Sequence, residues 1–233
     1  MTKKLSDLTR KTSDELLGAY RALMFAIADL TDSPFRNNLY MAWTEFDSYG
    51  SYDSSDRSRI RFSRSTDRGA TWSSSIVISD IEGDCLDDDH TTEGAVPAVG
   101  PEGQVYLSWS GPEGIVFDKS LDGGVTFGAV GFESMIHNAF DPWVAALVVD
   151  PNVSSNLYAV TGEGFFRSTN GGATWSRLEK GLPEGNLGKI GLAISPQNPD
   201  VLYAVIELDN RKGGLWRSAD RGTSWEKRSD AVT

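Results

Sequence analysis

Apolar residues in this chain occur in short runs, separated by turn residues at intervals of about ten. Glycine, proline, asparagine and aspartate interrupt the runs too often for buried helices. Runs that carry a tyrosine alternate with runs of small apolar residues. The tyrosine runs are residues 39–43, 105–109, 157–160 and 202–205, and the small-residue runs are 96–99, 144–149 and 190–194, with a weaker one at 25–28. This pattern predicts an all-β chain.

An octapeptide of the form Ser-x-Asp-x-Gly-x-Thr-Trp occurs four times, with starts about 50 residues apart. The residues at its fixed positions are Ser65, Asp67, Gly69 and Trp72; Ser120, Asp122, Gly124 and Phe127; Ser168, Asn170, Gly172 and Trp175; and Ser218, Asp220, Gly222 and Trp225. An Asp or Asn side chain accepts backbone N–H groups of its own turn, and Gly permits a positive φ. We therefore expect each octapeptide to form a structural hairpin.

Each repeat contains four short strands, which is typical of a β-propeller blade. The sequence predicts a propeller of about four four-stranded blades. The propeller domain is residues 21–233, with blades at about 21–80, 93–132, 141–179 and 188–229. Residues 1–20 form an N-terminal extension, and the segment 13–24 predicts a short helix with Ser13 as its N-cap. A closed four-blade ring, an incomplete propeller and an oligomer completed by another chain all fit this pattern.

Composition narrows the class of protein. The 233 residues are 39% hydrophobic and 24% charged, as expected for a globular chain. A net charge of −11 disfavours nucleic acid and anionic lipid as partners. No run approaches the ~18 apolar residues of a membrane-spanning helix, so no membrane insertion is expected. Cys85 is the single cysteine, which excludes an intrachain disulfide, and no secretory signal is visible at the N-terminus.

The four octapeptides resemble the Asp-box, the bacterial neuraminidase repeat. It is found in sialidases, xyloglucanase-type glycoside hydrolases, sortilin-type receptors and photosystem II assembly propellers. Residues 37–127 are similar to secreted sialidase-like proteins of bacteria, and the half from residue 141 is closer to xyloglucanase and assembly-factor repeats, as in residues 214–218. The resemblance implies a sialidase-like or glycoside-hydrolase-like propeller that acts on or binds glycans, in an extracellular or periplasmic location. The alternative is a non-catalytic scaffold that binds glycan or protein.

In the families that the chain resembles, the active site lies on the propeller face opposite the octapeptide hairpins. Glycoside hydrolysis commonly uses two carboxyl groups. Glu93 and Asp141 each lie just before a small-residue strand and are the candidate catalytic pair. The candidate substrate-binding residues on these loops are Trp143, as a platform for a sugar ring, and Arg57, Arg59 and His137. Arg57 and Arg59 also fit the exposed side of a strand that alternates arginine with apolar residues.

The loop 80–93 carries seven carboxylates in fourteen residues. Ionised carboxylates this close together repel one another unless a cation or water compensates them. Asp84, Asp87, Asp88 and Asp89 are therefore candidate ligands of calcium, although their spacing does not match the EF-hand loop. A solvated acidic loop is the alternative. No cofactor is required by anything else in the sequence.

Overall fold

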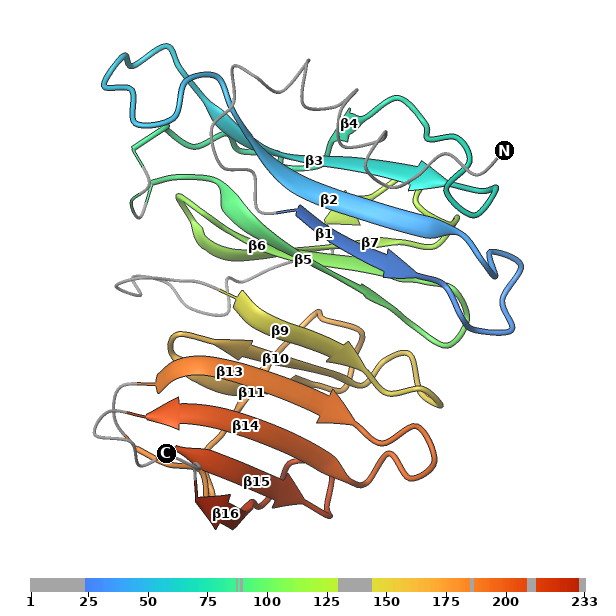
Figure 1. The fold of residues 1–233 in the computed structure, drawn as a ribbon, viewed down its shortest axis with the longest axis vertical. Coiled ribbons are helices and arrows are strands. Elements are labelled where there is room, and N and C mark those ends of the chain that lie inside the picture. Colours follow the sequence, from blue (N-terminus) through green and yellow to red (C-terminus); the bar gives the residue numbers. More distant parts are fainter. Residues whose placement is uncertain are drawn as a thin grey trace.

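The computed structural model describes residues 24–86, 88, 90–129, 144–184, 187–208 and 213–230. These residues form sixteen strands in four four-stranded antiparallel sheets (Figure 1). The first sheet contains β1 (Met24–Ala28), β2 (Leu39–Phe46), β3 (Ser58–Ser65) and β4 (Ile76–Val77). The second contains β5 (Glu93–Val99), β6 (Val105–Gly111), β7 (Gly114–Ser120) and β8 (Gly128–Ala129). The third contains β9 (Val144–Val149), β10 (Leu157–Thr161), β11 (Gly164–Ser168) and β12 (Ser176–Leu178), and the fourth β13 (Leu187–Ile194), β14 (Leu202–Leu208), β15 (Gly214–Ser218) and β16 (Glu226–Asp230).

The predicted fold class is confirmed, because each repeat is one sheet whose strands pair in chain order. The described residues include no helix, and so none that could span a membrane. The predicted helix at 13–24 lies almost wholly outside the described residues; its last residue, Met24, begins β1 instead.

The four octapeptides form hairpins with one shared set of hydrogen bonds. In the first, the Ser65 hydroxyl donates to Asp67 (2.8 Å) and accepts from the Gly69 N–H (2.8 Å), and Asp67 accepts the Thr71 N–H (2.8 Å). The same bonds recur in the other three copies, with Asn170 as the acceptor in the third. The glycine has a positive φ in every copy, from 79° to 96°. Short-range bonds of this kind fix the turn independently of the rest of the fold.

The octapeptide hairpins and the turns between the first two strands of each sheet lie at the same end of the sheets. In the third sheet, the Gly171 N–H donates to the carbonyl of Ser155 (2.9 Å), and in the fourth the Arg221 N–H donates to that of Asp200 (3.0 Å). We call this the hairpin end. At the opposite end, which we call the loop end, the second strand of each sheet ends and the third begins, and the fourth strand of one sheet ends and the first strand of the next begins.

The sheets pack in sequence order through three apolar clusters. Extensive contacts among the described residues join the first sheet to the second, the second to the third and the third to the fourth. The first and fourth sheets lie at opposite ends of the longest axis (Figure 1). The described sheets therefore form an open row rather than a closed four-blade ring.

Candidate functional site

The loop end of the first two sheets is built from two connections that bind each other. The segment 47–57 joins β2 to β3, and the segment 78–92 joins β4 to β5. The Gly50 N–H donates to the carbonyl of Cys85 (2.6 Å), and the Thr92 N–H donates to the Ser58 hydroxyl (2.8 Å). These long-range bonds give the polar side chains of this surface fixed positions.

An arginine–carboxylate cluster of Glu45, Asp47, Arg59, Arg61 and Glu82 lies on this surface. Arg59 donates to Glu45 (2.9 Å), to both oxygens of Asp47 (2.8 and 3.0 Å) and to Glu82 (2.8 Å). Arg61 also donates to Glu45 (2.8 Å). Glu45 and Arg59 are direct cross-strand partners of β2 and β3, which places their side chains on the same side of the sheet.

The cluster holds its charges at neutral pH. Burial acts to raise the pKa of Glu45, but hydrogen bonds from Arg59 and Arg61 outweigh it and lower that pKa. The hydrogen bonds of Arg59 also lower the pKa of Asp47, and Asp47 in turn raises the pKa of Arg59. Three carboxylates then face two guanidinium groups, so the cluster has a surplus of negative charge and neither Glu45 nor Asp47 is poised as a general acid.

Both arginines that the sequence singled out are engaged within the chain. Arg59 binds the three carboxylates of the cluster, and Arg57 donates to the backbone carbonyls of Ser54 and Asp56 in its own loop. The strand β3 alternates as predicted, with Ile60 and Phe62 buried and Arg59 half-buried on the other side. A ligand carboxylate would have to displace partners of Arg59 to reach its guanidinium, because all three of its nitrogens are engaged.

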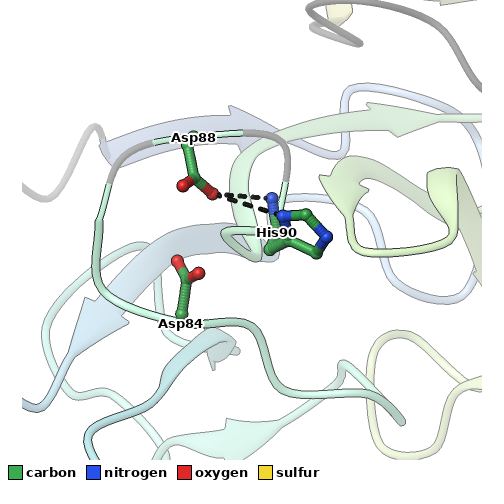
Figure 2. A group of neighbouring side chains, drawn as sticks. All are labelled: Asp84, Asp88 and His90. Atoms are coloured by element: carbon green, nitrogen blue, oxygen red, sulfur yellow. Dashed lines mark hydrogen bonds and ion pairs between the residues drawn. The ribbon is translucent and has the colours of Figure 1, made fainter. Parts of the chain in front are cut away.

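Figure 2 shows a second group on this surface, formed by Asp84, Asp88 and His90. One ligand atom from each lies within 4.8 Å of the others. Asp88 accepts the backbone N–H of His90 (2.9 Å), and Asp84 accepts the hydroxyl of Thr91 (3.0 Å) and the N–H of Leu86 (3.0 Å). The remaining predicted ligands, Asp87 and Asp89, lie outside the described residues. Two carboxylates and an imidazole supply fewer protein ligands than the six to eight oxygens of calcium, so water would complete such a site.

The candidate catalytic pair is described only in part. Glu93 begins β5, is half-buried and lies opposite Ser110 of β6. Asp141 lies outside the described residues, as do Trp143 and His137. The separation of the two carboxyl groups and the sugar platform therefore stay predictions.

Sequence reasoning missed the exposed aromatic residue of this surface. Tyr52, in the segment 47–57, is 91% exposed. Tyr49 in the same loop packs edge-on against Phe46, with ring centroids 5.1 Å apart. The sequence does contain a signal for this exposure, because Tyr52 lies in a loop of serine and aspartate residues and not in an apolar strand. The arginine–carboxylate cluster had no such signal, because its residues meet only once β2 and β3 are in register.

One buried carboxyl lies away from the loop end, between the first and second sheets. Asp118 of β7 is 4% exposed, and burial, followed by the nearby charge of Asp80, raises its pKa to about 6. Asp118 follows Phe117 along β7, so their side chains point to opposite sides of the second sheet. Phe117 belongs to the core between the second and third sheets, and Asp118 therefore faces the first sheet.

No protein-family model and no curated protein sequence matches the chain. Solved structures do resemble its fold. The NanB sialidase from Streptococcus pneumoniae is 12% identical with a TM-score of 0.62, over 92% of this chain and 52% of that one. The Hadza microbial sialidase Hz136 is 17% identical with a TM-score of 0.55, over 92% of this chain and 47% of that one. The GH74 enzyme of Niastella koreensis is 20% identical with a TM-score of 0.55, over 88% of this chain and 29% of that one.

The chain thus spans about half the length of the two sialidases and less than a third of the GH74 enzyme. At these identities the likeness concerns the fold, which is that of a sialidase-like propeller.

Proposed function

We propose that the chain binds glycans through the loop end of its first two sheets, and that its four hairpins are Asp-box repeats of a sialidase-like or glycoside-hydrolase-like propeller. The likeness of the fold to sialidases and a GH74 enzyme supports this class. An extracellular or periplasmic location goes with the proposal, because polymeric glycans are found there.

The observation that carries the proposal is an exposed aromatic ring in a loop-end connection that also carries charged side chains. At the hairpin end, the serine and aspartate side chains are occupied by the hydrogen bonds of their own turns. At the loop end, the fully exposed ring of Tyr52 lies in the same connection as Asp47 of the arginine–carboxylate cluster. An apolar ring face in a connection that also carries hydrogen-bonding groups is a combination that suits a sugar.

The charges of this surface favour an uncharged glycan. Arg59 is surrounded by three carboxylates, and the chain carries a net charge of −11. An anionic sugar would meet repulsion here, and all three guanidinium nitrogens of Arg59 already donate to carboxylates of the chain. We therefore propose neutral glycans, such as β-glucans, ahead of sialosides.

Hydrolysis is the catalytic form of the proposal. Glu93 and Asp141 would act as its two carboxyl groups, one donating a proton to the leaving glycosidic oxygen and the other activating water or attacking the sugar carbon. Trp143 and His137 would contact the substrate. A propeller that binds glycan or protein without turnover is the alternative, and kinetics separates the two.

The test is hydrolysis of a panel of fluorogenic glycosides that includes β-glucosides and sialosides, with binding to a glycan array measured in parallel. Turnover that is lost in both Glu93→Gln and Asp141→Asn supports the catalytic form. Array binding without turnover supports the binding form. A folded chain that neither binds nor cleaves any glycan contradicts the proposal.

A further inference from the structure

Each of the four sheets has two sides that differ in sequence. The tyrosine side carries the tyrosine of the second strand and the residue two positions later. These pairs are Tyr40 and Ala42, Tyr106 and Ser108, Tyr158 and Val160, and Tyr203 and Val205. The reverse side carries the residues immediately before, between and after the two members of each pair. These sets are Leu39, Met41 and Trp43; Val105, Leu107 and Trp109; Leu157, Ala159 and Thr161; and Leu202, Ala204 and Ile206.

Among the described sheets, each interface joins the tyrosine side of one sheet to the reverse side of the next. Tyr40 and Ala42 share a cluster with Val105 and Leu107 of the second sheet. The same pairing unites the second sheet with the third, and the third with the fourth.

The contact is close because a hairpin glycine of the next sheet faces the aromatic ring. A methyl group on Gly172 would lie 2.3 Å from a carbon of the Phe117 ring, and one on Gly124 would lie 2.8 Å from the Phe62 ring. The glycines thus let the next hairpin approach the tyrosine side.

The fourth sheet leaves its tyrosine side uncovered. Tyr203 is 41% exposed and Val205 is 59% exposed. The equivalent residues of the other three sheets are buried, with exposures of 1% or less: Tyr40, Ala42, Tyr106, Ser108, Tyr158 and Val160.

The first sheet leaves its reverse side incompletely covered. Leu39, Met41 and Trp43 are each half-buried. The equivalent residues of the other three sheets are all buried, with exposures of 2% or less: Val105, Leu107, Trp109, Leu157, Ala159, Thr161, Leu202, Ala204 and Ile206. The first and fourth sheets therefore present the two halves of the interface that occurs three times between the described sheets.

We propose that a second copy of this chain docks here, with the reverse side of its first sheet on the tyrosine side of the fourth. The interface between the first and second sheets also contains a polar contact, in which the guanidinium of Arg64 donates to the carbonyl of Gly123 in the hairpin of the second sheet (3.1 Å). Arg217 holds the same position in the fourth sheet and would donate to the carbonyl of Arg68 in the second copy.

The association is heterologous, because it uses a different surface of each copy. Two copies joined at both ends would place eight sheets around one axis, within the range of four to eight blades known for propellers. Copies joined at one end only would extend as an open row.

Sedimentation equilibrium of the full chain, at concentrations up to about 200 µM, tests this docking. The average mass of the wild-type chain is expected to exceed the 25.4 kDa of one copy and to rise with concentration. Val205→Glu places a charge in the interface without touching the core, and it is expected to weaken association at least tenfold. Val125→Glu, on an exposed hairpin valine of 48% exposure, is the matched control and is expected to associate like the wild type.

A mixing experiment separates this arrangement from a symmetric contact between two fourth sheets. Met41→Glu places a charge on the reverse side of the first sheet, so each of the two variants alone is expected to be monomeric. An equal mixture of Met41→Glu and Val205→Glu retains one intact interface and is expected to form a heterodimer. Circular dichroism and the melting temperature establish that both variants are folded. A monomeric wild type at the highest concentration, a Val205→Glu chain that associates normally, or a mixture that stays monomeric overturns the docking.

Discussion

Asp118 gives the sharpest prediction about the stability of this fold. Its carboxyl is buried between the first and second sheets, with Asp118 only 4% exposed. Burial raises its pKa from 3.8 to about 6, with a further contribution from Asp80. We predict that Asp118→Asn makes the free energy of unfolding less dependent on pH, because the amide has the shape of the carboxyl and never ionises.

The direction follows from linkage between proton binding and folding. The folded chain binds the Asp118 proton more tightly than the unfolded chain does, so the wild type is most stable below the unfolded pKa and loses stability as pH rises to about 6. A rise of about two units corresponds to about 3 kcal/mol, at 1.36 kcal/mol per unit. About 2 kcal/mol of this develops between pH 4.5 and 7.5, since part of the loss already precedes pH 4.5.

Urea unfolding followed by tryptophan fluorescence at both pH values measures the effect. The stability of Asp118→Asn relative to wild type should increase by about 2 kcal/mol from pH 4.5 to 7.5. Comparing the two pH values cancels any pH-independent packing change caused by the amide. Glu113→Gln, an exposed carboxyl in the turn between β6 and β7, controls for the loss of one negative charge. Wild-type and Asp118→Asn stabilities that run parallel within about 0.5 kcal/mol would refute the reasoning.

Three further predictions concern other parts of the chain. Gly172→Ala should cost about 2 kcal/mol more than Gly50→Ala in urea unfolding, because both have a positive φ but only the first methyl meets a ring, that of Phe117; equal costs would contradict this. Arg59→Gln should cost about 2 kcal/mol at pH 7, and this cost should shrink as pH falls below the ordinary pKa values of Asp and Glu and on through the lowered pKa values of Glu45 and Asp47; a pH-independent cost in the same assay would contradict it. Calcium at about 5 mM should stabilise the wild type by about 2 kcal/mol if its Kd is near 10⁻⁴ M, measured as a rise in melting temperature that Asp84→Asn loses; an equal rise in both would place the ion elsewhere.

The hairpins could be predicted from the sequence because their bonds are local. Every shared bond of the octapeptides joins residues two or four positions apart, such as Ser65 with Asp67 and with Gly69. The four-sheet architecture followed from the period of these hairpins and from the alternation of the strands between them.

The arginine–carboxylate cluster could not be predicted in the same way. Arg59 lies 12 to 23 positions from three of its contacts, namely Glu45, Asp47 and Glu82. These contacts depend on the register of β2 with β3 and on the path of the segment 78–92, neither of which local patterns determine.

The open row of sheets could not be predicted from the sequence either. A repeat shows that neighbouring units pack alike, but the closure of a ring depends on the angle between sheets, which no residue pattern reports. Tyr203 looks the same in sequence as Tyr40, Tyr106 and Tyr158, and its exposure appears only in three dimensions.

The most direct test of the central claim, glycan binding at the loop end, compares two variants on a glycan array and in titrations with the strongest neutral glycan. Tyr52→Ala removes the exposed ring of the loop end, and Leu121→Ala removes an exposed leucine of the hairpin end. We predict that Tyr52→Ala weakens binding about tenfold, the equivalent of about 1.4 kcal/mol, and that Leu121→Ala leaves it unchanged. Binding that survives Tyr52→Ala, or that Leu121→Ala weakens equally, would contradict the account.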